Sequence, residues 1–394
     1  MQKIILYIFA FSALLFLSNC KMTKALKAKK VFEKNATTVQ NSFFKQEIPF
    51  KLQNKQIVIP VKIENETYHF MLDTGRPTTI EPYLKKKLNL KQVITPFADS
   101  NFVSIPKVTV GNIDFLSSLS VVESVDTFHC TKIDGRLGAN FMQSAIWKID
   151  YQRKKITLTN YRDSLQKDSV KTINFKTWLY GMPYSNAYFS PYYDIVVSFF
   201  TSEAHSFCFS ELIKSSLPSN QKYVKCYTKY QRREKIDTAS FSNIPYMRFE
   251  SGLIVHNNLA HFESKQFTYS GNIGYDFFKN YICTFDWGMK KISLQPISKP
   301  ENKIEGFGMS MWSINNKLTI YCLYEGMPAM EAGLHLGDEI LSLDDLAFEN
   351  ITKEQFCEKR ENIIKILEKE EITLKVKQKD SIKTVILKKK KIDF

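Results

Sequence analysis

The strongest constraint on this chain of 394 residues is a segment that occurs twice. Residues 134–158 and 270–294 align without a gap at an offset of 136, and nine of the 25 positions are identical. Each copy carries a glycine step, Leu137-Gly138 in the first and Ile273-Gly274 in the second, ahead of a pattern that predicts a β-hairpin. Two copies are too few for a solenoid, which needs at least three repeats. We therefore expect a two-lobed unit rather than a repeat array.

Composition agrees with a folded, β-rich protein. The hydrophobic share of 44% is globular, and the aromatic share of 13% favours packed sheets. The net charge of +15 comes largely from lysine runs, and no zinc-finger, helix-turn-helix or RNA-binding signature accompanies them. We therefore expect no nucleic-acid partner.

A predicted hairpin in the first half ends in three residues suited to chemistry. Alternation over 56–63 predicts one strand, a polar turn follows, and residues 67–72 form the return strand. That strand leads directly into Asp73-Thr74-Gly75. The hairpin delivers a carboxylate into a sharp turn in which glycine allows close backbone approach. The alternative is an aspartate that only caps its own turn.

Asp73-Thr74-Gly75 on such a hairpin, with Leu137-Gly138 and the repeat, resembles the active-site region of retropepsin-like aspartic proteases. The resemblance implies that Asp73 is the catalytic acid, that the Thr74 hydroxyl braces the site and that Gly75 permits close approach. It also implies a mainly β fold of two acid-protease-like barrel lobes, over 46–160 and 161–300, with Leu137-Gly138 crossing behind the catalytic turn.

Aspartic protease chemistry needs two carboxylates about 3 Å apart that share one proton. The offset of 136 maps Asp73 to Phe209 and Thr74 to Ser210, so we expect the second lobe to lack its acid. We also expect Arg76 to pair with Asp73. Two classes of function stay open. One is an endopeptidase whose second carboxylate comes from elsewhere, and the other is an impaired relative that binds peptide or protein segments.

The last part of the chain, 303–394, carries a second resemblance. Residues 326–341, GMPAMEAGLHLGDEIL, resemble the central segment of PDZ domains. An amphipathic helix over 353–368 and strands over 371–377 and 382–388 are predicted to follow. The resemblance implies an α+β module in which the loop Gly306, Phe307, Gly308 and Met309 receives a terminal carboxylate and the ligand adds as a strand. The alternative is a PDZ-shaped domain that packs on its neighbour without a ligand.

The amino terminus predicts export. Lys3 and the apolar run 4–17 are typical of a signal peptide, and Leu17-Ser18-Asn19-Cys20 resembles the bacterial lipobox apart from Asn19. The resemblance implies a signal over 1–20 and a lipidated Cys20. It also implies a basic tether over 21–45 and a membrane-anchored protein in the cell envelope that faces the periplasm.

The remaining cysteines do not predict a metal centre. Cys130, Cys208, Cys226, Cys283, Cys322 and Cys357 are scattered, with no CxxC pair and no histidine at ligand spacing. We expect no metal and no cofactor. An exported location permits disulfides, but the sequence does not assign pairs.

Overall fold

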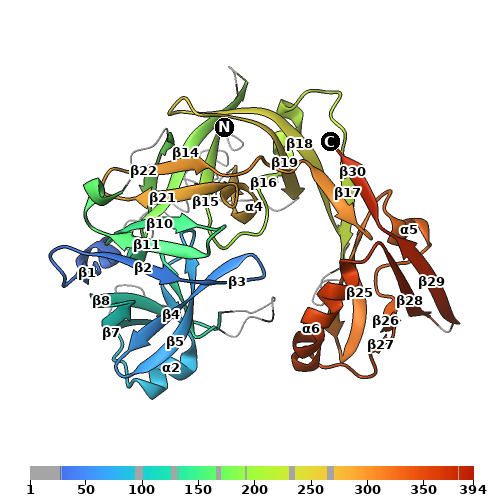
Figure 1. Ribbon diagram of the computed structural model, residues 1–394, viewed down its shortest axis with the longest axis horizontal. Helices are drawn as coiled ribbons and strands as arrows, with labels where there is room; N and C mark the ends of the chain where they lie inside the picture. The colour runs from blue at the N-terminus through green and yellow to red at the C-terminus, as the bar shows by residue number, and fades with distance from the viewer. Residues whose placement is uncertain are drawn as a thin grey trace, which may run out of the picture.

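The computed structural model describes residue 27 and residues 29–93, 101–125, 130, 133–165, 170–190, 193–229, 236–263, 270–379 and 381–394. The chain is mainly β and has two lobes followed by a C-terminal module (Figure 1). The expected signal peptide over 1–20, with Cys20, lies outside the described residues. Among those residues, no helix combines the length and the apolar character needed to cross a bilayer.

The first lobe is an eight-stranded sheet that contains the expected hairpin. Its strands are β1 (Thr38–Val39), β3 (Lys51–Gln53), β4 (Gln56–Ile63), β5 (Glu66–Asp73), β6 (Thr79–Ile80), β7 (Phe102–Val110), β8 (Ile113–Val122) and β9 (Gly135–Gly138), with helices α2 (Pro82–Lys87) and α3 (Ala139–Met142). Strands β4 and β5 pair antiparallel, with Val58 opposite Met71. Alternation explains the hairpin, because Val61 and Ile63 are buried while Lys62 between them is exposed.

The second lobe repeats this arrangement. Its strands are β13 (Lys176–Trp178), β14 (Met182–Ser190), β15 (Tyr193–Phe199), β16 (Phe207–Ser210), β17 (Val224–Thr228), β18 (Asp237–Phe249), β19 (Ile254–Glu263) and β20 (Gly271–Ile273), with the helix α4 (Tyr275–Phe278). In both lobes the strand at the glycine step lies between a parallel and an antiparallel partner. β9 lies between β5 and β6, and β20 lies between β15 and β16. The duplication that the sequence predicts is therefore present in the topology.

A six-stranded sheet joins the two lobes. Its order is β12 (Lys171–Asn174), β22 (Lys291–Pro296), β21 (Tyr281–Asp286), β10 (Ile146–Asp150), β11 (Lys155–Thr159) and β2 (Lys45–Pro49). At its centre, Ile146 lies opposite Asp286 and Asp150 lies opposite Ile282. These four residues are two identical pairs of the repeat, the two isoleucines and the two aspartates. Across the sheet, the isoleucine of each copy faces the aspartate of the other copy. The two copies thus meet about a local twofold axis.

Part of the range expected as a tether packs on the first lobe. Residues 29–34 are helical, Phe32 is buried, and Thr38–Val39 pairs with β8. Phe32 contacts the rings of Phe102 and Tyr180 edge-on. The lysine-rich pattern gave no sign of this contact, because one buried aromatic residue leaves no periodicity.

The C-terminal module has its own core and continues the sheet of the second lobe (Figure 1). Its elements are β23 (Lys303–Gly306), β24 (Met309–Ile314), β25 (Lys317–Tyr324), α5 (Pro328–Glu331), β26 (Glu339–Leu343), β27 (Leu346–Ala347), α6 (Lys353–Leu367), β28 (Glu371–Gln378), β29 (Ser381–Lys388) and β30 (Lys390–Asp393). The predicted helix begins at a capping box between Thr352 and Gln355. Strand β25 pairs with β17, so one sheet crosses the boundary between lobe and module.

Two kinds of cysteine are present. Cys130 of the first lobe forms a disulfide with Cys357 on α6, across a sequence separation of 227 residues. Within the described residues, Cys208, Cys226, Cys283 and Cys322 are buried and form no disulfide.

Candidate functional site

The turn after β5 holds Asp73 inside the first lobe. Strand β5 runs parallel to β9, with Leu72 opposite Leu137 and Asp73 opposite Gly138. A Cβ added to Gly138 would lie 2.2 Å from the carbonyl carbon of Pro77, so only glycine fits behind the turn. Asp73 is 2% exposed, and its Oδ1 accepts a hydrogen bond from the Gly75 N–H at 2.9 Å. The predicted order of Asp73, Thr74 and Gly75 in a sharp turn is therefore present.

The cation beside Asp73 is Arg136 rather than Arg76. Nε of Arg136 lies 3.1 Å from Oδ2 of Asp73, and both side chains are largely buried. Arg136 reaches this place because β9 runs beside β5. Arg76, which we expected to make this contact, is exposed, and its backbone carbonyl accepts from Ala139. Sequence proximity suggested Arg76, whereas strand pairing brings in a residue 63 positions after Asp73.

Two threonines, one from each lobe, lock the two turns together. The Thr74 N–H donates to Oγ1 of Thr201 at 3.2 Å, and the Thr201 N–H donates to Oγ1 of Thr74 at 3.1 Å. The hydroxyls then donate across the interface, from Thr74 to the Phe199 carbonyl at 2.5 Å and from Thr201 to the Leu72 carbonyl at 3.0 Å. Both threonines are fully buried. Thr74 therefore braces the site with a partner that the sequence reading missed.

This frame identifies the residue opposite Asp73 as Phe200. Phe199 pairs with Ile273 in the second lobe as Leu72 pairs with Leu137 in the first. The next residue, Phe200, thus occupies the position of Asp73, and Thr201 occupies that of Thr74. Phe209 instead pairs with Gly271 as Ile80 pairs with Gly135.

The assignment of Asp73 to Phe209, and of Thr74 to Ser210, is therefore wrong. The spacing from the turn to the glycine step is 65 residues in the first lobe and 74 in the second. The second lobe therefore has an insertion between its turn and its glycine step. A constant sequence offset misplaces every residue that lies before this insertion. The pattern that could have revealed Phe200 is an apolar strand followed by Phe200-Thr201-Ser202, which parallels Asp73-Thr74-Gly75.

The Phe200 ring fills the space in front of Gly75. A Cβ added to Gly75 would lie 2.1 Å from Cδ1 of Phe200. On the same turn, the Tyr180 hydroxyl donates to the Gly75 carbonyl at 3.0 Å. Burial and the Asp73 charge raise the pKa of Tyr180 to about 12, so this phenol remains a donor across the physiological range. Two aromatic side chains thus pack on the turn that carries Asp73.

The chemistry open to this arrangement is limited. In the described part of the chain, the side-chain contacts of Asp73 are with the Gly75 N–H and with Arg136, and neither is a carboxylate. An aspartic dyad needs one group to act as base and the other as acid in the same step. One carboxylate held by a guanidinium meets only half of that requirement.

The loop before β24 holds the other group of predicted site residues. Gly306 and Gly308 have φ of 141° and 73°, and the buried Phe307 between them accepts a hydrogen bond from the Ala329 N–H. Met309 begins β24. Trp312 of β24 contacts Phe356 of α6 edge-on, with ring centroids 5.0 Å apart. Strand β24 thus begins directly after the loop and packs against α6.

Comparisons with known proteins add little to this geometry. No family model matches the chain, and no curated protein matches it either. Among solved structures, it is similar to the crystal structure of basic 7S globulin from soybean, with 9% identity and a TM-score of 0.38. That match covers 65% of this chain and 96% of the globulin chain.

Proposed function

We propose that this chain is a non-catalytic relative of the retropepsin-like aspartic proteases that binds peptide or protein segments. The observation that carries the proposal is Phe200, an apolar ring at the position where the dyad needs its second carboxylate. The intact frame of Thr74 and Thr201 supports loss of chemistry without loss of architecture. Arg136 supports it further, because a guanidinium beside Asp73 takes the place of a shared proton.

The proposed binding element is the C-terminal module, which we interpret as PDZ-like. Within the described residues, β24 pairs with β25 alone, so its second edge can accept an added strand beside α6. The loop Gly306, Phe307, Gly308 and Met309 would receive the terminal carboxylate of that strand. In this proposal Cys20 is lipidated and holds the protein at the bacterial cell envelope, where exported proteins supply the segments.

The catalytic part is tested with the full chain. Wild-type protein and Asp73→Asn are incubated with a denatured protein mixture from acid to neutral pH, and products are read by mass spectrometry. We expect no cleavage by either protein. Cleavage by the wild type that Asp73→Asn abolishes would establish the protease and overturn the non-catalytic assignment.

The binding part uses a library of peptides with a free carboxyl terminus and the same peptides amidated. We expect micromolar binding to the full chain that amidation weakens. Gly306→Ala should weaken binding, while Gly326→Ala serves as its control. Both glycines have positive φ and open space for a Cβ, so both changes carry backbone strain, but only Gly306 lies in the loop. Equal affinity of free and amidated peptides, or equal loss in both variants, would contradict the proposed groove.

A further inference from the structure

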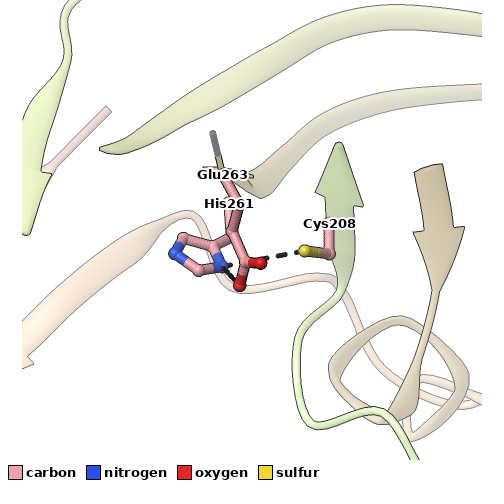
Figure 2. A group of neighbouring side chains, drawn as sticks. All are labelled: Cys208, His261 and Glu263. Carbon is pink, nitrogen blue, oxygen red and sulfur yellow. Dashed lines mark hydrogen bonds and ion pairs between the residues drawn. The ribbon is translucent and has the colours of Figure 1, made fainter. Parts of the chain in front are cut away.

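A cysteine, a histidine and a glutamate converge on the second lobe, far from Asp73 in sequence (Figure 2). Strand β16 runs parallel to β19 with Cys208 opposite His261. Because side chains alternate along a strand, His261 and Glu263 share one face of β19. Cys208 lies on that face of the neighbouring strand. Sheet pairing thus assembles three metal-ligand types from residues 53 and 55 positions apart.

The spacing of the three side chains matches the edges of a metal coordination sphere. Sγ of Cys208 lies 3.8 Å from Nδ1 of His261, and that nitrogen lies 3.4 Å from Oε1 of Glu263. All three ligand atoms lie within 4.8 Å of one another. Around a tetrahedral zinc ion with ordinary bond lengths, sulfur and nitrogen ligands are about 3.6 Å apart, and nitrogen and oxygen ligands about 3.4 Å. The separation of Cys208 and Glu263 is within the same 4.8 Å limit.

The surroundings fix the imidazole and leave room for another ligand. The Phe241 ring stacks on His261 with centroids 4.5 Å apart, and the His205 ring lies 4.4 Å away. A cavity of about 390 Å³ is lined by His261 and Glu263, among others. Cys208 and His261 are buried, while Glu263 is half-buried at the cavity. Three protein ligands beside a cavity are typical of zinc sites that keep an open position.

We propose that Cys208, His261 and Glu263 bind one Zn²⁺ ion, with its fourth position toward this cavity. Binding forms the zinc–sulfur bond and releases the thiol proton to solvent. A thiolate and a carboxylate then balance the two positive charges, as a largely buried ion requires. The mixed sulfur, nitrogen and oxygen set favours zinc over magnesium or calcium, which take oxygen ligands.

Cobalt(II) is the probe, because a cobalt–thiolate bond gives a near-ultraviolet charge-transfer band and cobalt occupies zinc sites. The reduced full chain is titrated with Co²⁺, which is then displaced by Zn²⁺. We expect one site per chain. Cys208→Ser should abolish the charge-transfer band and lower the affinity for Zn²⁺ at least about 100-fold. Even changes to residues outside the ligand set lower metal affinity 10- to 100-fold. Cys283→Ser, which changes a buried thiol outside the site, is the matched control.

Two more variants keep the test decisive. Glu263→Gln should lower the affinity for the metal while keeping the charge-transfer band. Because Glu263 is only half-buried, this variant keeps the test available if Cys208→Ser fails to fold. His261→Ala should lower the affinity for the metal, whereas His256→Ala on the same strand should leave it unchanged.

Cys226 and Cys322 line the same cavity, with their sulfur atoms 2.7 Å apart, so they are the rival ligands. The double variant Cys226→Ser, Cys322→Ser should keep the charge-transfer band. Loss of the band in that variant alone would place the ion on the thiol pair and overturn the proposal. So would failure of the folded wild type to bind either metal.

Discussion

Thr74 and Thr201 take part in four hydrogen bonds at the point where the two lobes meet, two to each other and two to backbone carbonyls. Each hydroxyl accepts one backbone N–H and donates to one backbone carbonyl, so both of its capacities are used. Because the pair is fully buried, no water can replace a missing partner. The frame therefore contributes to stability whether or not the neighbouring carboxylate has a catalytic role.

The first prediction concerns this frame. Thr201→Val keeps the shape but leaves the Thr74 N–H and the Leu72 carbonyl without their partner, so we expect a loss of about 2–3 kcal/mol. Urea unfolding measures it. Thr228→Val removes one longer hydroxyl contact on a half-buried residue and should cost less than about 1 kcal/mol. Equal losses would show that the buried frame is not special.

A second residue-scale prediction concerns His205 and pH. Burial, with some contribution from Lys55, lowers its pKa from 6.5 to about 4, while Asp276 acts in the opposite direction. The unfolded chain therefore takes up this proton first. Stability should be lost as pH falls from about 6.5 through about 4, by at most about 3 kcal/mol.

Unfolding measured with a chelator present, so that no metal contributes, tests this pH dependence. His205→Gln should flatten the pH slope in that window, whereas His256→Gln, at an exposed position, should leave it unchanged. The same slope in all three proteins would contradict the role of His205.

At the scale of elements, local sequence patterns predict individual strands and helices, but they do not predict which strands pair when these are far apart in the sequence. The hairpin before Asp73 and the helix α6 could be predicted because alternation and helical periodicity are properties of neighbouring residues in the sequence. Phe200 could not be placed, because an insertion before β20 changes the repeat offset without altering strand character. Cys208 lies beside His261 because β16 pairs with β19, and no rule on residue spacing predicts that pairing.

The pairing of β17 with β25 yields an element-scale prediction. A fragment over 303–394 keeps the module core but loses β17, which exposes a β25 edge carrying Cys322 and Leu323. Uncovered apolar edges associate. We expect the fragment to self-associate in light scattering, and the full chain, in which β17 covers this edge, to do so less. A strictly monomeric 303–394 fragment would show that β17 is dispensable.

At the scale of the whole molecule, the module is held to the lobes in two separate ways. The sheet joins it to the second lobe through β17 and β25, and the disulfide between Cys130 and Cys357 joins it to the first lobe. One connection reaches each lobe, so the module is fixed to both lobes rather than suspended on a linker.

The last prediction tests the disulfide. It closes a loop of 227 residues, so the double variant Cys130→Ser, Cys357→Ser should lose about 2–5 kcal/mol. Denaturant unfolding measures this loss, and Cys283→Ser is the control at a free cysteine. If the double variant unfolds at the same midpoint as the control, the disulfide adds no stability.

The central sheet also sets the order in which a chain made from its amino terminus can finish folding. Strand β10 is complete once residue 150 has emerged, and β11 and β2 can cover one of its edges at once. Its other edge waits for β21, which begins at Tyr281. From the emergence of residue 150 until that of β21, the first lobe therefore presents an unpaired strand to its surroundings. Until its second copy arrives, the lobe that carries Asp73 is therefore open to association through this edge.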